Sequence, residues 1–220
     1  RSSLLIQTGR FDFVIDAGPD FRQQMLRENV QNLDAILLTH EHKDHIAGID
    51  DVRAFNYKSR KAIDLFCEES VQMAVRREYP YVFAEKRYPG APMLNLHTVD
   101  ESPFMLGGLE VVPVRASHFW LPVFGFRISD LAYITDANYI SPENIEKLKG
   151  VKYFILNALR KEKHISHYNL DEAIEVIREV NPLHGFITHI SHQMGFHNDV
   201  SESLPPGISL AYDGLGFECE

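Results

Sequence analysis

The stretch Asp34–Gly48, which reads DAILLTHEHKDHIAG, constrains the fold more than any other part of the chain. Ala35–Leu38 is a short apolar run of the kind that forms a buried strand. Four polar side chains follow where that strand should end: His40, His42, Asp44 and His45. Proteins of the α/β class place their chemistry at strand ends. The stretch therefore predicts a buried strand that delivers functional side chains.

The spacing of the four side chains suggests two metal ions. His40 and His42 are two residues apart in extended chain, so both point to the same side and can bind one ion. If a helix begins at Asp44 and His45 and runs on through Phe55, these two side chains face a neighbouring position. Imidazole and carboxylate groups suit Zn, Mn and Fe. The His-Glu-x-x-His pair of zinc proteases does not fit, because the residue four after His40 is Asp44.

The same pattern recurs, because four further predicted strands end at a potential ligand. They are Phe11–Ala17 with Asp16, Leu109–Ala116 with His118, Leu131–Thr135 with Asp136, and Gly185–Thr188 with His189. This recurrence predicts that separate strands converge on one site. Phe119 and Trp120 directly follow His118, and they either line the site or pack in the core.

The other predicted elements complete a mixed α/β pattern. Further strands are expected at Ser3–Thr8, Ile63–Cys67, Val123–Ile128, Tyr153–Leu159 and Ile208–Ala211, and helices at Phe21–Asn29, Glu68–Tyr79, Pro142–Lys149 and Leu170–Val180. The expected N-caps are Asp20, Ser141 and Asn169. Tyr79–Phe104 is rich in proline and aromatic residues, which predicts an irregular insertion with short strands at most. It is either a lid or interface, or a surface loop, and we expect its His97 to be structural.

Composition bounds the class of protein. A chain of 220 residues with 45% hydrophobic content can bury one core, so we expect a single domain over residues 1–220. The net charge is −9, and the sequence has no stripe of basic residues, which argues against binding to DNA or RNA. Two distant cysteines, and no signal peptide or membrane-length apolar run, favour a cytoplasmic protein without a membrane partner. Because the chain begins with Arg1, we expect its extreme N-terminus to be missing.

Taken together, the motifs THEHKDH, the SH pair at His118, ITDA at Asp136 and THISH at His189 resemble the successive motifs of the metallo-β-lactamase superfamily. The resemblance covers nearly the whole chain. It implies a four-layer αββα sandwich with a binuclear site along one edge. The implied ligands are His40, His42 and His118 for the first ion, Asp44, His45 and His189 for the second, and Asp136 as the bridge. The two divalent ions would be Zn or Mn, with Fe also compatible.

Two further residues take their expected roles from the same resemblance. Asp16 matches the first motif of the superfamily, where a carboxylate supports the histidine-rich loop without binding metal. The diiron oxygen reductases of the superfamily carry Glu at the position of His42. The histidine found here therefore favours hydrolysis over redox chemistry.

Within the superfamily, GIDDVRAFNY, NALRKEKHISHYNLDEA, THISHQ and AYDGLGFE are similar to the branch of phosphoribosyl 1,2-cyclic phosphate phosphodiesterases. The tRNA 3′-processing endonucleases are cousins of this branch. His167 matches a histidine that protonates the leaving alkoxide or contacts the phosphoryl oxygens; the alternative is a capping or packing histidine. Arg160 and His192 are candidate substrate-binding residues, although arginine after a strand is also a common surface residue.

These expectations favour a phosphodiesterase that cleaves a small or cyclic phosphate ester, with a hydroxide shared by two metals as nucleophile. The expected partner is a small phosphorylated substrate, and a homodimer is left open. Hydrolysis of a lactone or thioester is the first alternative. RNA 3′-processing is a second, which the acidic chain disfavours. A non-catalytic metal- or nucleotide-binding module is the third.

Overall fold

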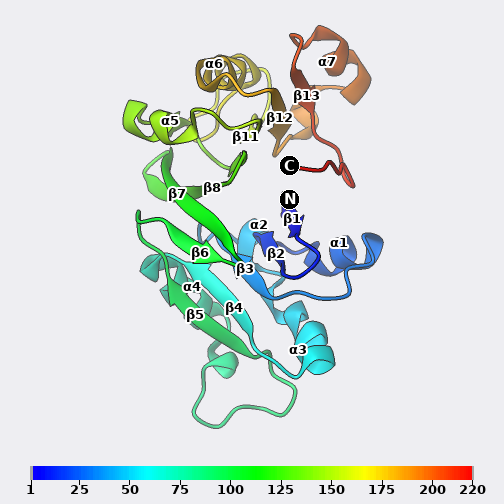
Figure 1. Ribbon diagram of the computed structural model, residues 1–220, viewed down its shortest axis with the longest axis vertical. Helices are drawn as coiled ribbons and strands as arrows, with labels where there is room; N and C mark the ends of the chain where they lie inside the picture. Colours follow the sequence, from blue (N-terminus) through cyan, green and yellow to red (C-terminus); the bar gives the residue numbers. More distant parts are fainter. Residues whose placement is uncertain (1, 220) are drawn as a thin grey trace. The chain divides into compact units, whose positions relative to one another are not determined.

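The computed structural model describes residues 2–219. They form two compact units that meet in sequence between Asp100 and Glu101. Each unit is built around its own β-sheet, with helices packed against that sheet (Figure 1). The expected mixture of strands and helices is confirmed. The assignment of residues 1–220 to a single domain stays a prediction.

The sheet of the first unit has five strands in the order β1-β2-β3-β4-β5. Their bounds are β1 Leu4–Gln7, β2 Asp12–Ile15, β3 Ala35–Leu37, β4 Ile63–Cys67 and β5 Leu94–Thr98. β1 and β2 are antiparallel, and the other neighbouring strands are parallel. β3 is fully buried and apolar, as is typical of a central parallel strand.

The helices of the first unit bury their apolar sides against this sheet. Their bounds are α1 Phe21–Arg27, α2 Lys43–Ile46, η1 Ile49–Val52, α3 Arg53–Ser59, α4 Glu69–Glu78 and η2 Pro80–Val82. Phe21 of α1 and Val75 of α4 belong to one buried cluster with Ile36 of β3. Burial of one such side chain contributes about 1.5–3 kcal/mol, so this cluster holds the helices against the sheet.

Two sequence predictions in this unit are wrong. The single helix expected from Asp44 through Phe55 is three short pieces, interrupted at Gly48 where the backbone packs against another segment. Asp20 lies at the N-cap of α1, but its side chain makes no capping hydrogen bond. Its φ of −93° and ψ of 4° are not the extended conformation that lets a cap side chain reach the first turn.

The sheet of the second unit has eight strands. Seven follow the order β10-β7-β8-β9-β11-β12-β13, and β6 pairs with β7. Their bounds are β6 Phe104–Leu106, β7 Leu109–His118, β8 Leu121–Ile128, β9 Leu131–Ile134, β10 Tyr139–Ile140, β11 Tyr153–Asn157, β12 His184–Thr188 and β13 Ile208–Leu210. The strands from β9 onward along this order are parallel, so the ends of β9, β11 and β12 lie at the same edge.

The helices of the second unit confirm the predicted caps. Their bounds are α5 Pro142–Leu148, α6 Leu170–Val180, η3 His192–Met194 and α7 His197–Ser203. The Ser141 side chain accepts a hydrogen bond from the backbone N–H of Asn144. Asn169 and Glu172 form the predicted capping box, and such a cap is worth about 1 kcal/mol.

The predicted insertion is more regular than its composition indicates. Within Tyr79–Phe104 lie η2 and the whole of β5, which pairs with β4. His97 on β5 hydrogen-bonds the Asp64 carboxylate at 3.0 Å and stacks on Phe66, so its structural role is confirmed. The insertion therefore supplies the edge of the first sheet.

Phe119 and Trp120 do not pack in the core. They occupy the tight turn between β7 and β8, where Phe119 is 45% and Trp120 85% exposed. The two strands are longer than predicted, which leaves only these residues in the turn. The expectation that this pair packs in the core is therefore wrong.

Candidate metal centre

The first unit brings its four candidate ligands together directly after β3. One ligand atom each of His40 and His42 lie within 4.8 Å of one another, and the same holds for Asp44 and His45. His42 is the N-cap of α2, in extended conformation, so the chain turns into a helix between the two pairs. The division of these four side chains between two metal ions stays a prediction.

Asp16 lies at the end of β2, beneath the loop that carries these ligands. Its fully buried carboxylate accepts hydrogen bonds from the backbone N–H of Thr39 at 2.9 Å and from the Thr39 hydroxyl at 2.9 Å. It also lies 2.7 Å from Nδ1 of His45. A carboxylate on one ring nitrogen fixes the tautomer of a histidine and turns the other nitrogen, Nε2, into a metal ligand. Asp16 thus orients His45 without occupying the ligand position.

Backbone contacts fix the loop on the strand end. The N–H of Asp16 donates to the carbonyl of Leu37, and the N–H of Ala17 donates to the carbonyl of His45, each at 2.8 Å. Asp16 has a φ of 66°, a left-handed conformation that Asp adopts more easily than most residues. Local backbone strain of this kind clusters at functional sites.

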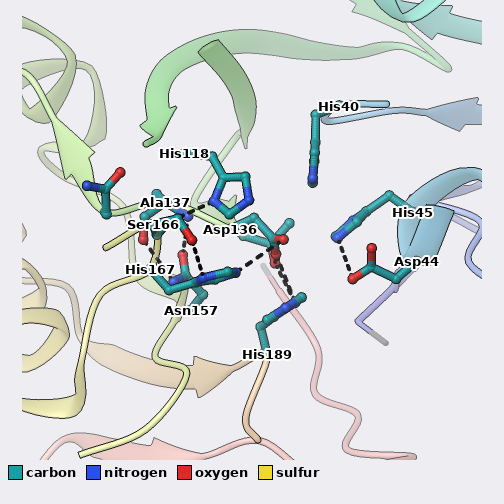
Figure 2. A network of polar contacts seen from close by, with 12 residues as sticks. His40, Asp44, His45, His118, Asp136, Ala137, Asn157, Ser166, His167 and His189 are labelled. Carbon is teal, nitrogen blue, oxygen red and sulfur yellow. Dashed lines mark hydrogen bonds and ion pairs between the residues drawn. The ribbon is translucent and has the colours of Figure 1, made fainter. Parts of the chain in front are cut away.

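The second unit gathers three candidate ligands at the ends of β7, β9 and β12. Ligand atoms of His118 and Asp136 lie within 4.8 Å of one another, and so do those of Asp136 and His189 (Figure 2). The Asp136 Oδ1 lies 2.8 Å from Nδ1 of His189 and accepts a hydrogen bond from the Thr135 hydroxyl at 2.8 Å. Asp136 is 2% exposed. Its carboxylate is therefore the shared member of both ligand groups.

His167 lies beside this cluster, and Ser166 orients it. Nδ1 of His167 is 3.0 Å from the Ser166 hydroxyl and 3.2 Å from Nδ1 of His164, while Nε2 is 3.5 Å from the Asp136 carboxylate. The backbone carbonyl of Ser166 lies 2.7 Å from Nδ1 of His118 (Figure 2). One residue thus sets the ring orientation of a candidate ligand and of a candidate proton donor.

The imidazole of His164 is suited to accept a hydrogen bond from His167. Burial, together with the charges of His167 and Arg160, lowers the pKa of His164. Its imidazole is therefore neutral at neutral pH and can accept the proton that Nδ1 of His167 shares. This arrangement leaves Nε2 of His167 directed at the Asp136 carboxylate.

Asn157 and Ser166 are residues that sequence reasoning missed. The side chain of Asn157, fully buried at the end of β11, accepts from the N–H of Ala137 at 2.7 Å and donates to its carbonyl at 2.9 Å. It therefore fixes the chain directly after Asp136. A polar residue ending the apolar run YFILN was the available signal for Asn157; nothing in the sequence distinguishes Ser166 from an ordinary loop serine.

The two predicted substrate-binding residues have different environments. The guanidinium of Arg160 donates to the carbonyls of Glu162 and Lys163 and to the side chain of Gln193, so it holds the loop after β11. His192 is the first residue of η3 and is exposed. Their contact with a substrate stays a prediction.

The donor set fits divalent metal ions. Nδ1 of His45 faces a carboxylate and Nδ1 of His118 faces a carbonyl, so each ring presents a deprotonated Nε2. Neutral imidazole with carboxylate is the ligand combination that Zn, Mn and Fe accept. The His/Asp clusters of both units are therefore suited to bind divalent metals.

The family of the chain follows from comparison with known proteins. A family model described as the beta-lactamase superfamily domain matches residues 12–190. The chain therefore belongs to this superfamily, and metal-dependent hydrolysis is the activity typical of it. The predicted superfamily and its fold type are confirmed.

A particular branch is indicated by a solved structure. A diphosphatase from the PhnP family is 34% identical with a TM-score of 0.92, and the match covers 100% of this chain and 85% of that one. The metallo-β-lactamase fold protein YhfI from Bacillus subtilis is 19% identical with a TM-score of 0.80, covering 97% of this chain and 89% of that one. The second likeness shows the fold alone.

One curated relative is named for acyl transfer and not for hydrolysis. An octanoyltransferase of Porphyromonas gingivalis (strain ATCC BAA-308 / W83) is 39% identical over 218 residues, which is 98% of this chain and 44% of that protein. The chain thus spans less than half the length of this relative. Across the part of the chain that the structure describes, no helix has the length and apolar character needed to span a membrane.

Proposed function

We propose that the chain is a metal-dependent phosphodiesterase acting on a small or cyclic phosphate ester. The ligand sets of both units, four side chains from the first and three from the second, would serve one pair of divalent ions, as the family resemblance implies. When bound, such ions activate water near neutral pH and neutralise phosphoryl oxygens. The choice of ester rests on His167, a candidate proton donor beside the ligand cluster.

The observation that carries the proposal is the arrangement of His118, Ser166 and His167. Expulsion of an alkoxide needs a proton, and a general acid must lie within reach of the reacting group. Ser166 holds His167 so that Nε2 lies 3.5 Å from the Asp136 carboxylate, while the same residue orients His118. When His167 carries a proton on Nε2 as well as on Nδ1, the Nε2 proton is available to a leaving oxygen near Asp136.

A second candidate is hydrolysis of a diphosphate linkage. The structural neighbour at 34% identity is described as a diphosphatase. Both reactions break a phosphorus–oxygen bond, and both need the same ligands. They differ in the leaving group, because a phosphate leaves with less help from a proton than an alkoxide does.

Octanoyl transfer does not enter the proposal. More than half of the Porphyromonas gingivalis octanoyltransferase lies outside the match. The matched residues of this chain include its own metal-ligand motifs, which are typical of hydrolases.

The purified chain is expected to release p-nitrophenolate from bis(p-nitrophenyl) phosphate when Mn or Zn is supplied. A chelator should abolish this activity and added metal should restore it. The assay should be run beside a panel of diphosphates, lactones and thioesters. Turnover confined to diphosphates would select the second candidate. Metal-loaded protein that cleaves lactones or thioesters but never a phosphodiester or diphosphate would overturn the proposal.

Replacing His167 with alanine is expected to slow cleavage of alkyl phosphodiesters by about 10²–10⁴-fold, the usual contribution of general acid catalysis. Cleavage of bis(p-nitrophenyl) phosphate should change little, since p-nitrophenolate leaves without a proton. The measurement is kcat across phosphodiesters whose leaving groups have rising pKa values. His197→Ala, at an exposed histidine of α7, is the control. Equal losses for all leaving groups would show that His167 is structural.

A further inference from the structure

The first unit contains a cleft that none of the candidate ligands lines. Its volume is about 920 Å³, near the upper end of small-molecule sites. It is bordered by α1, by α3 and by the segment at residues 90–93 of the insertion. A cleft of this size, lined by none of the candidate metal ligands, can bind a small molecule of its own.

The wall of the cleft is fixed rather than loosely packed. Asn56 of α3 is 3% exposed, and its amide donates to the carbonyls of Lys61 and Met93 at 2.8 and 3.0 Å. Its Oδ1 accepts from the N–H of Met93 at 2.9 Å. The two hydrogen bonds with Met93 join the insertion to α3, and the third ties α3 to the chain that follows it. The cleft is therefore preformed, which lowers the entropic cost of binding.

The lining is mostly apolar. Met25 of α1, Phe55 of α3 and Met93 of the insertion contribute to it. Leu26 and Tyr57, which also line the cleft, are 65% and 76% exposed. Large apolar side chains exposed together around a cleft mark a binding surface more often than isolated ones do. The occupant should therefore carry an apolar chain.

The charged groups of the lining are mainly positive. Four are cations and one, Asp51, is a carboxylate; the cations are Arg22, Arg53, Lys58 and Arg60. This excess contrasts with a chain whose net charge is −9. Such a local reversal of charge attracts an anionic ligand.

Two of the four cations already have a polar partner. Arg53 pairs with Asp50 at 3.0 Å, and the Lys58 ammonium donates to the carbonyl and side chain of Gln31. Within residues 2–219, no ion pair engages Arg22 or Arg60, although the Arg60 guanidinium lies over the Tyr57 ring. Their planar guanidinium groups are suited to carboxylate or phosphate.

We propose that this cleft binds an amphipathic anion with a straight alkyl chain, such as a fatty acid or an alkyl phosphate. The alkyl chain lies along Met25, Phe55 and Met93, and the headgroup contacts the guanidinium of Arg22 or Arg60. The site is independent of the metal ligands. Binding therefore does not depend on the proposed hydrolase activity.

The test is isothermal titration of the full chain with decanoate, decyl phosphate and decanol. Both anions should bind, and decanol should bind about tenfold more weakly because it lacks the charge. Arg22→Gln together with Arg60→Gln should weaken both anions to the level of decanol, and the single variants identify the headgroup partner. Arg178→Gln, on the exposed side of α6, is the matched control. Ala54→Trp, which fills the cleft, should abolish binding while the circular dichroism spectrum is unchanged.

Binding of only one of the two anions would identify the headgroup and support the proposal. Absence of binding at millimolar anion, or binding that is unaffected by both Ala54→Trp and the double arginine variant, would overturn it. A dimer that Ala54→Trp dissociates, with no anion bound, would also overturn it, because the occupant would then be a second copy of the chain. Sedimentation velocity distinguishes that outcome from the others.

Discussion

Asp136→Asn is expected to reduce phosphodiester turnover by about 10³-fold or more, since it removes the negative charge shared by both ligand groups of the second unit. Asparagine retains the size of the side chain and an acceptor oxygen for the Thr135 hydroxyl. It also tolerates the φ of 55° at this position better than alanine does. The substitution thus isolates the charge from the local conformation.

Metal content provides the readout independent of activity. We expect Asp136→Asn to bind fewer metal ions per chain by plasma emission spectrometry, while its metal-free form unfolds within a few degrees of the metal-free parent. Asp171→Asn, at an exposed carboxylate of α6, should change neither quantity. A fully metal-loaded Asp136→Asn variant with near-normal turnover would contradict the assignment of Asp136 as the bridging ligand.

Strand ends were predictable because the relevant signals are local. A short apolar run followed by a ligand-type residue marks the ends of β3 and β9, and the structure places His40 and Asp136 at these ends. The caps at Ser141 and Asn169 are equally local, since each side chain reaches only three residues along the chain. These strand ends and caps can be predicted without knowing which other segment of the chain packs against them.

The break after α2 could not be predicted because its cause is tertiary. The apolar spacing through Ile49 and Val52 suits one continuous helix, yet the chain forms three short pieces. Gly48 is the site of the break, because its backbone packs closely against Gly18, thirty residues earlier in the chain. Helical periodicity records which face is buried and not where a neighbouring backbone passes.

The orienting residues of the second unit were hidden for a similar reason. Ser166 acts on His118 across a sequence separation of 48 residues, and its carbonyl, which any residue would supply, makes the contact. The sequence therefore identifies the candidate metal ligand His118 but not Ser166, which orients it. The family resemblance located His167, but only the geometry shows what holds it.

Gly48→Ala is expected to destabilise the protein severely and to displace the ligand loop. A Cβ on Gly48 would lie 2.1 Å from the carbonyl oxygen of Gly18 and 2.6 Å from Cβ of Phe21. The first contact is with backbone, so a side-chain rotation cannot relieve it. The N–H of Gly48 also donates to the carbonyl of Ala17 at 2.8 Å, and a shift of the backbone would break that bond.

The free energy of unfolding should fall by about 3 kcal/mol or more, the upper range for overpacking a well-packed site. Urea denaturation of the metal-free protein measures this change. Gly216→Ala is the control, because a Cβ there meets nothing within 4 Å. Metal affinity should fall as well, since the displaced segment is joined to His45 through the hydrogen bond from Ala17. A stable Gly48→Ala protein with unchanged metal affinity would show that the loop tolerates a wider separation from the end of β2 than the structure indicates.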